Sequence, residues 1–252
     1  MPFQLQTRAD AAEKDATFES KARPWKGQGD NYYTAYTPDL LVRAKCMIQQ
    51  AVDTLQGMSF VFVRPPGHHA AADGKAAGFC HKNNAWIAVE RLKSKGLNRI
   101  AIFDWDAHHG DGTEDCLMAS GYTDVRFCST HAFGADVYPG TGAAFENEQI
   151  LNLPLSVGTS ARAYETVFQE RVVPFLKAGD PQAIIVSAGY DAHEEDPMGL
   201  LKLQDSTYRY MSVVLKTIGV PVLFLLEGGY QPDVLARCVK ETLKPWSEIP
   251  AH

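Results

Sequence analysis

Short apolar runs alternate with longer amphipathic stretches along most of the chain, and this alternation restricts the fold more than any other feature. The apolar runs cover 60–63, 99–105, 125–129, 150–153, 183–186 and 220–226. Helical spacing of apolar residues predicts helices over 39–55, 85–95, 164–177, 205–217 and 232–243. Strands that are apolar along their whole length and are connected through helices are typical of a parallel sheet covered on both faces. We therefore predict an α/β fold with a central, mostly parallel sheet and helices on both faces.

The length of 252 residues, 45% of them hydrophobic, is sufficient for one large domain with a sizeable core. Two domains also fit this length, but no internal repeat or low-complexity segment divides the chain. Pro24, Gly27 and Gly29 break the periodicity near the start. We predict an irregular N-terminal arm over 1–30 and a single folded domain over 31–252.

Charge and cysteine content exclude several classes of protein. The formal net charge is −6 and no Lys/Arg cluster is present, which argues against direct binding of nucleic acid. A mildly acidic surface favours a basic substrate such as a lysine-rich tail, but it is also ordinary for solubility. The five cysteines form no Cys-x-x-Cys pair and are odd in number, which is typical of a reducing compartment.

The start of the chain is polar and mixed in charge, and no apolar stretch approaches the ~20 residues that a membrane helix needs. We expect a cytoplasmic protein without membrane contact, with the nucleus and organelles left open.

Unusual polar residues collect directly after the predicted strands. They lie in 64–69, 104–112, 130–131, 187–193 and 227–230, and six of the eight histidines fall in these segments. A random distribution would scatter the histidines along the chain. Because ligands of open α/β sheets bind at the carboxyl ends of the strands, we predict the functional site there.

Asp106 and His108 are two residues apart, so at an extended strand end their side chains point the same way. Asp191, after another strand, can supply a third ligand. Three protein ligands leave an open position for water, as catalytic zinc sites do. The oxygen-rich set also accepts Fe²⁺, so the spacing does not define the element.

His68 and His69 follow a Pro-Pro-Gly turn, and Asp104 and Asp111 remain once the metal has its ligands. A carboxylate that hydrogen-bonds an imidazole orients the ring and stabilises its charged form. Two such pairs are therefore predicted, one acting as general base and the other as electrostatic partner or general acid. Tandem histidines on the surface are the competing interpretation.

The turn Gly228-Gly229-Tyr230 follows the last predicted strand. Two glycines let the backbone turn sharply and approach a ligand. The tyrosine phenol can donate to a carbonyl opposite the metal and stabilise an oxyanion. A core tyrosine after a glycine turn is the alternative.

Together these segments resemble the zinc-dependent histone deacetylase and acetylpolyamine amidohydrolase superfamily, and above all its class II and bacterial-type branch. The matching motifs are RPPGHHA (64–70), GFC (78–80), DWDAHHGDGT (104–113), YPGTG (138–142), SAGYDAHEEDP (187–197) and LEGGY (226–230). The resemblance implies a single-domain, arginase-like, three-layer α/β fold.

The resemblance also implies roles for particular residues. The implied ligands of Zn²⁺ are Asp106, His108 and Asp191. The implied catalytic residues are His68 paired with Asp104, His69 paired with Asp111, and Tyr230. The implied substrate-binding residues are Gly78, Phe79, Tyr138, Met198 and Gly229. A structural K⁺ or Na⁺ would be bound by the side chain of Ser129 and by the carbonyls of Asp104, Asp106, His108 and Thr130.

The sequence departs from this family before residue 64. Full catalytic domains usually carry a His-Pro-Glu-type motif on an N-terminal loop, and this chain reaches RPPGHHA without one. The rim that grips the substrate backbone and a buried arginine for acetate release are therefore in question. A more open pocket, a shortened form, or a homo-oligomer or partner chain that completes the rim are the alternatives.

The predicted function is metal-dependent removal of acetyl or other acyl groups from lysine ε-amines in proteins or peptides, with His69 as general base. The apolar Met198 favours this class over acetylated polyamines, although Glu194 and Glu195 keep the polyamine alternative open. An arginase-like ureohydrolase would use two manganese ions and more carboxylates. A catalytically weak acyl-lysine binding module is disfavoured because every chemical residue is present.

Overall fold

The computed structural model describes residues 23–24 and 31–247. A seven-stranded sheet with strand order β3-β9-β8-β4-β5-β7-β6 forms its centre. The strands are β3 (Met58–Val61), β4 (Ile100–Asp104), β5 (Val125–Phe133), β6 (Phe145–Glu146), β7 (Ile150–Ser156), β8 (Ala183–Ala188) and β9 (Val222–Leu226). All pairs are parallel except β6 with β7. Every residue of β4, β8 and β9 is buried, which confirms the prediction of a sheet covered on both faces.

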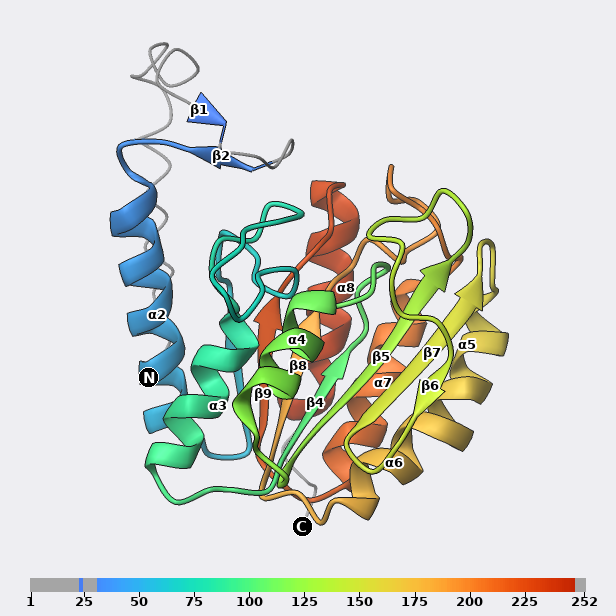
Figure 1. Ribbon diagram of the computed structural model, residues 1–252. Coiled ribbons are helices and arrows are strands. Elements are labelled where there is room, and N and C mark those ends of the chain that lie inside the picture. The colour runs from blue at the N-terminus through green and yellow to red at the C-terminus, as the bar shows by residue number, and fades with distance from the viewer. Residues whose placement is uncertain (1–22, 25–30, 248–252) are drawn as a thin grey trace.

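Helices cover the two faces of this sheet and give the predicted three layers (Figure 1). On one face lie α2 (Thr37–Asp53), α3 (Asn84–Ser94) and α4 (Asp111–Ser120), and on the other α5 (Ala161–Val167), α6 (Val173–Ala178), α7 (Asp205–Thr217) and α8 (Pro232–Ser247). Each face has its own apolar core. Ile48, Val89 and Leu117 pack in the first, and Met211 and Val234 pack in the second.

Two short features differ from the pattern in the sequence. Strand β3 covers Met58–Val61 instead of 60–63, because the N–H of Val63 donates to the carbonyl of Val61 at 2.9 Å in a tight turn. The apolar pattern predicts neither β6 nor α4. Helix α4 begins at Asp111 within a polar, glycine-containing segment, so its first turn carries no helical apolar spacing.

The helix predicted over 164–177 begins earlier and is interrupted. Ser160 caps its start by accepting a hydrogen bond from the Ala163 N–H. A π-helical turn over Phe168–Val172 then separates α5 from α6. Pro174 has no N–H to donate within the helix, and its ring would clash with the preceding turn. The wider π-helical turn relieves this clash. The helix is therefore interrupted before the proline and not in its last turn.

The predicted N-terminal arm lies outside the described residues except for β1 (Arg23–Pro24), which pairs antiparallel with β2 (Tyr32–Tyr33). Residues 248–252 of the predicted domain also lie outside them. In the part of the chain that the structure describes, no helix is both long and apolar enough to cross a bilayer.

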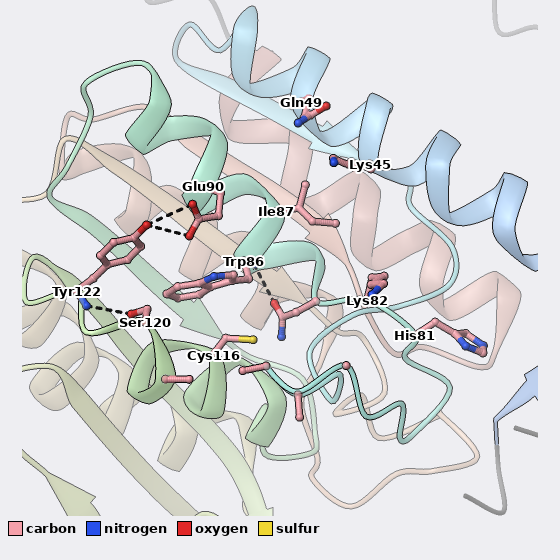
Figure 2. A pocket seen from close by; sticks show the side chains of 15 residues that line it. Lys45, Gln49, His81, Lys82, Trp86, Ile87, Glu90, Cys116, Ser120 and Tyr122 are labelled. Carbon is pink, nitrogen blue, oxygen red and sulfur yellow. Dashed lines mark hydrogen bonds between the residues drawn. The ribbon is translucent and has the colours of Figure 1, made fainter. Parts of the chain in front are cut away.

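A surface cleft of about 680 Å³ lies between α2, α3 and α4 (Figure 2). Lys45 of α2, Trp86 and Glu90 of α3, and Cys116 of α4 line it, and Tyr122 beyond α4 bonds Glu90. None of the site residues predicted from the sequence lines this cleft, so it is separate from the site described next.

Candidate active site

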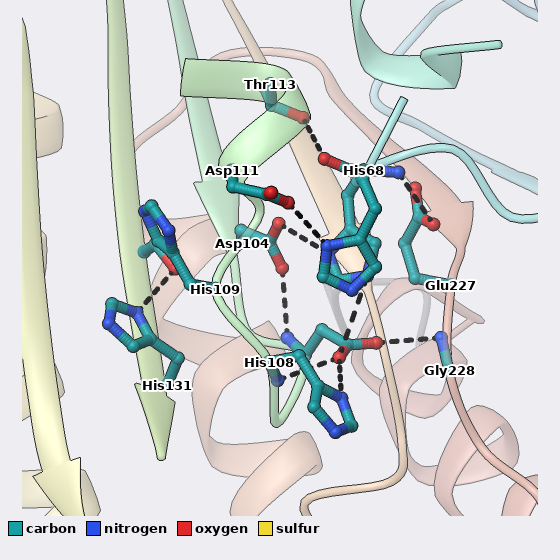
Figure 3. Close-up of polar contacts among 12 residues, drawn as sticks. His68, Asp104, His108, His109, Asp111, Thr113, His131, Glu227 and Gly228 are labelled. Carbon is teal, nitrogen blue, oxygen red and sulfur yellow. Dashed lines mark hydrogen bonds and ion pairs between the residues drawn. The ribbon is translucent and has the colours of Figure 1, made fainter. Parts of the chain in front are cut away.

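Four neighbouring parallel strands bring the predicted residues to one edge of the sheet. Strands β9, β8, β4 and β5 lie side by side in this order. Asp104 at the end of β4 is in register with Ser129 of β5 and Ser187 of β8. The loops that follow these strands therefore start at the same level, and their polar residues meet above the carboxyl ends of the strands (Figure 3).

The three predicted metal ligands converge in this place. Asp106, His108 and Asp191 are buried, and each offers a ligand atom within 4.8 Å of the others. His108 Nδ1 lies 3.0 Å from Asp106 Oδ1 and 3.0 Å from Asp191 Oδ2. Burial disfavours a charged ring, but the adjacent carboxylates of Asp106 and Asp191 outweigh burial and raise the pKa of His108 to about 10. The protonated ring of His108 therefore supplies one positive charge beside the two carboxylates of Asp106 and Asp191.

This donor set fits a divalent cation. Asp191 Oδ2 is buried and makes no hydrogen bond of ordinary geometry among the described residues. Burial and repulsion from Asp106 raise the pKa of Asp191 to about 6. The two buried carboxylates carry more negative charge than the single imidazole can balance. Carboxylate oxygens and an imidazole nitrogen are ligands that zinc and other first-row ions bind.

Backbone groups hold the two carboxylates in position. The N–H of Gly228 donates to Asp106 Oδ2 at 2.8 Å, and the N–H of Ala107 donates to Asp191 Oδ1 at 2.9 Å. A Cβ on Gly228 would lie 2.3 Å from Asp191 Oδ2, so only glycine fits this close approach. The Gly-Gly turn therefore positions the metal ligands as well as Tyr230.

The two predicted His–Asp pairs are both present. His68 Nδ1 lies 3.0 Å from Asp104 Oδ2, and His69 Nδ1 lies 2.6 Å from Asp111 Oδ1. The two rings are adjacent, with centroids 4.0 Å apart. His68 Nε2 is 3.8 Å from Asp106 Oδ1, which places this pair directly against the metal ligands. Both histidines are buried, so the surface interpretation of the tandem histidines is wrong.

The two histidines differ in electrostatic surroundings. Burial opposes a charge on His68, but the carboxylates of Asp106 and Asp104 outweigh burial and raise its pKa well above the ordinary value. Burial and the neighbouring charge of His68 lower the pKa of His69 to about 4, against the pull of Asp111. At neutral pH His69 is therefore an uncharged base, whereas His68 carries a positive charge.

Exposed aromatic side chains surround the mouth of the site. Phe79 and Tyr230 are 47% and 40% exposed, and their rings meet edge to face with centroids 6.2 Å apart. The ring of Tyr138 stands perpendicular to His69 at 4.9 Å. A Cβ on Gly78 would lie 2.4 Å from His69 Cδ2, so the backbone at residue 78 passes directly against the ring of His69. The role of Phe79 and Tyr138 as walls of an acyl channel stays a prediction.

The sequence interpretation gave Asp196 no role, although it lies in the motif over 187–197. Its Oδ2 accepts from the N–H of Tyr230 at 2.7 Å, and its Oδ1 accepts from the N–H of Met198 at 2.9 Å. One carboxylate thus joins the turn that carries the tyrosine, with Gly229 at φ +124°, to the loop that carries the predicted rim residue. Its position directly before Pro197 in the motif was the available signal.

The residues of the predicted monovalent cation site lie close together around the end of β4. Ser129 Oγ is 2.9 Å from His131 Nδ1, and Thr130 Oγ1 donates to the carbonyl of Asp104 at 3.4 Å. The hydroxyl of Ser129 therefore already has a partner on its own strand. Binding of K⁺ or Na⁺ here stays a prediction.

Glu227 and a histidine cluster are further buried polar groups that the sequence interpretation did not assign. Glu227 Oε2 accepts from the Gly67 N–H at 2.7 Å, and burial raises the pKa of Glu227 to about 7. His109 Nδ1 lies 2.9 Å from Thr141 Oγ1, and His131 Nε2 donates to the carbonyl of Gly142 at 2.8 Å. These two histidines support the loop that carries Tyr138.

A family model for the histone deacetylase domain matches residues 4–245. The chain belongs to the histone deacetylase family. Histone deacetylase 14 of Arabidopsis thaliana, a chloroplastic protein, is 35% identical over 240 residues, which cover 87% of this chain and 56% of the relative. Acetylpolyamine amidohydrolase of Mycoplana ramosa is 37% identical over 196 residues, which cover 74% of this chain and 55% of the relative.

A solved structure with a similar fold confirms the predicted architecture. The crystal structure of the HDA15 HD domain matches with a TM-score of 0.82 at 31% identity, over 90% of this chain and 66% of that chain. The chain spans about half the length of the curated relatives it matches, namely 61%, 56% and 45% of three of them. The family is one of hydrolases, and its named members include both a histone deacetylase and an acetylpolyamine amidohydrolase. The cytoplasmic location stays a prediction, since two relatives are chloroplastic.

Proposed function

We propose that this histone deacetylase family member is a metal-dependent deacylase that removes acetyl or other acyl groups from lysine ε-amines in proteins or peptides. The convergence of Asp106, His108 and Asp191 within 4.8 Å carries this proposal. The two His–Asp pairs and Tyr230 lie around that point and supply the proton transfers that amide hydrolysis requires. Zinc is the proposed ion, and Fe²⁺ is the alternative that the ligand types accept.

A divalent cation at the trio supplies Lewis acidity for the amide carbonyl and for a water molecule. His69, neutral and oriented by Asp111, accepts the proton of the attacking water and delivers it to the departing amine. His68 keeps its charge and stabilises the negative charge that develops beside it.

Tyr230 is the proposed oxyanion donor. Burial and the carboxylates of Asp106 and Asp191 raise its pKa, so the phenol keeps the proton that it must donate. Phe79 and Tyr138 are proposed to form the walls for the aliphatic chain of the lysine, and the carbonyl of Gly78 to accept from the substrate amide.

The surroundings of the mouth favour acyl-lysine over an acetylated polyamine. A polyamine needs free acidic groups near the rim. Glu195 forms an ion pair with Arg237 at 2.8 Å. Glu194 accepts a hydrogen bond from the neutral amide of Gln204 at 3.4 Å, which does not balance its charge, so Glu194 keeps the polyamine alternative open. Met198 at the proposed rim is apolar and 45% exposed. A partner chain or second copy that completes the rim stays a prediction.

A turnover panel tests this proposal. Acetyl-lysine peptides, longer acyl-lysines and acetylated polyamines are offered to the chain loaded with Zn²⁺ or with Fe²⁺, with and without a chelator. We expect the highest kcat/KM on acyl-lysine peptides and its loss with the chelator. A preference for acetylated polyamines would overturn the substrate class. No turnover with either metal would support a binding module instead.

A further inference from the structure

A second group of metal-ligating side chains lies beside the active site, and the proposed reaction uses only one of them. His68, Cys80 and Glu227 are 3%, 0% and 0% exposed, and each offers a ligand atom within 4.8 Å of the others. We propose that these three residues form a second metal site, which binds a zinc-like cation through a thiolate, an imidazole and a carboxylate.

Glu227 provides the observation that calls for a ligand. Its Oε2 accepts from the backbone N–H groups of Gly67 and His68. Its Oε1 is buried and has no hydrogen-bond partner among the described residues. The guanidinium of Arg64 donates to the backbone carbonyl of Glu227 and not to its carboxylate. An unpaired buried carboxylate oxygen is costly, and a cation would remove this cost.

His68 and Cys80 complete a ligand set of the right chemistry. Asp104 holds Nδ1 of His68, which leaves Nε2 for an ion. Cys80 Sγ donates weakly to the carbonyl of Gly78 at 3.3 Å, and burial raises the pKa of this thiol, so a cation has to displace the thiol proton before the sulfur coordinates. Sulfur, nitrogen and oxygen together are a set that zinc and cobalt bind, whereas the trio of Asp106, His108 and Asp191 contains no sulfur.

A third group, His193, Asp205 and Cys238, has ligand atoms equally close together but needs no ion. His193 Nε2 lies 3.0 Å from Asp205 Oδ1, and the other carboxylate oxygen accepts from Arg237 Nε at 2.9 Å. The charge of Asp205 is thus already balanced by an arginine. Cys238 is therefore a matched control for Cys80, because both thiols are fully buried.

The second site has a consequence for catalysis that rests on the proposed function. His68 Nε2 lies 3.8 Å from Asp106 Oδ1, so an ion on this nitrogen would compete for a carboxylate of the proposed catalytic trio. Excess metal should therefore lower turnover, and the Cys80→Ser variant should resist this loss.

Titration of Co²⁺ into the metal-free full chain, followed by absorption, tests the site without reference to activity. A thiolate ligand produces a near-ultraviolet charge-transfer band with cobalt, which the sulfur-free trio cannot produce. We expect only weak visible bands for the first equivalent and the near-ultraviolet band for the second. The band should disappear in Cys80→Ser and persist in Cys238→Ser.

The visible bands of the first equivalent report whether each variant is folded. Glu227→Gln gives a second check, because loss of a ligand should weaken binding of the second equivalent at least ~10-fold. Absence of the near-ultraviolet band over several equivalents, or its persistence in Cys80→Ser, would overturn the second site and leave deacylase activity untouched. A band without deacylase activity would instead overturn the proposed function alone.

Discussion

Oδ1 of Asp111 lies 2.6 Å from Nδ1 of His69, so the first residue of α4 orients the one tandem histidine that stays uncharged at neutral pH. The adjacent His68 faces Asp104 and Asp106 and keeps its proton. Two identical side chains, next to each other in sequence, thus have pKa values shifted in opposite directions. Asp106 and Asp104 raise the pKa of His68, whereas burial and the charge of His68 lower the pKa of His69. This difference assigns the base of the proposed reaction.

Replacement of His69 should remove this base. We expect His69→Ala to lower kcat by ~10²–10⁴-fold while the trio still binds one equivalent of metal. Because the pKa of His69 is lowered to about 4, the acid limb of kcat/KM in the unmodified chain should lie below the ordinary histidine value, with activity lost as pH falls. Stopped assays on an acetyl-lysine peptide across pH, together with metal analysis, measure both. An active His69→Ala variant would exclude this residue as the base.

Removal of the Tyr230 hydroxyl should slow turnover without weakening substrate binding. Tyr230→Phe keeps the ring against Phe79 but loses the proton donor. We expect kcat to fall by ~10²–10³-fold with little change in KM or metal content. Tyr210→Phe is the control, since its hydroxyl bonds Gln169 and joins α7 to the π-helical turn. Normal turnover by Tyr230→Phe would contradict the oxyanion role.

A single methyl group at Gly228 should disrupt the metal ligands. The added Cβ would lie 2.3 Å from Asp191 Oδ2 and 2.6 Å from Asp106 Oδ2. We expect Gly228→Ala to lose metal affinity while it retains its circular dichroism spectrum. Gly134→Ala is the matched control, because its Cβ would meet only Val137 at 3.5 Å. Equal metal affinity of the two variants would show that Gly228 does not position the carboxylates.

His131 should make stability depend on pH. Burial and the neighbouring His109 lower the pKa of His131 to about 4, below the ordinary value of 6.5. Between these values the unfolded chain binds a proton that the native chain does not, so stability rises with pH and is lost as pH falls. We expect His131→Gln to reduce the difference in unfolding free energy between about pH 7 and pH 4.5 by ~2 kcal/mol. Urea unfolding measures this difference, and an unchanged difference would contradict the role of His131.

The clustering of the site was predictable because it depends on topology. Parallel strands end at one edge, so polar residues after several strands must meet there, and Asp106, His108 and Asp191 do. The two His–Asp pairs were predictable because two histidines and two aspartates remain once the metal ligands are assigned. The family motifs indicated which aspartate pairs with which histidine.

Other features depend on distances that no local pattern contains. The raised pKa of His68 arises from Asp106 and from Asp104, which is 36 residues away along the chain, and the lowered pKa of His69 arises from burial and from His68. Helix α4 begins with a polar segment that has no apolar spacing. The group formed by His68, Cys80 and Glu227 joins the connection between β3 and α3 to the loop after β9. Only the folded structure shows that Glu227 Oε1 lacks a hydrogen-bond partner among the described residues.

Deacetylation of an acetyl-lysine peptide by the chelator-treated chain, before and after addition of one equivalent of Zn²⁺, tests metal-dependent deacylation most directly, with Asp191→Asn measured alongside. We expect no turnover in the chelated chain, recovery after one equivalent, and no recovery in Asp191→Asn. Turnover in the chelated chain, or normal recovery in Asp191→Asn, would contradict catalysis by a metal ion held at Asp106, His108 and Asp191.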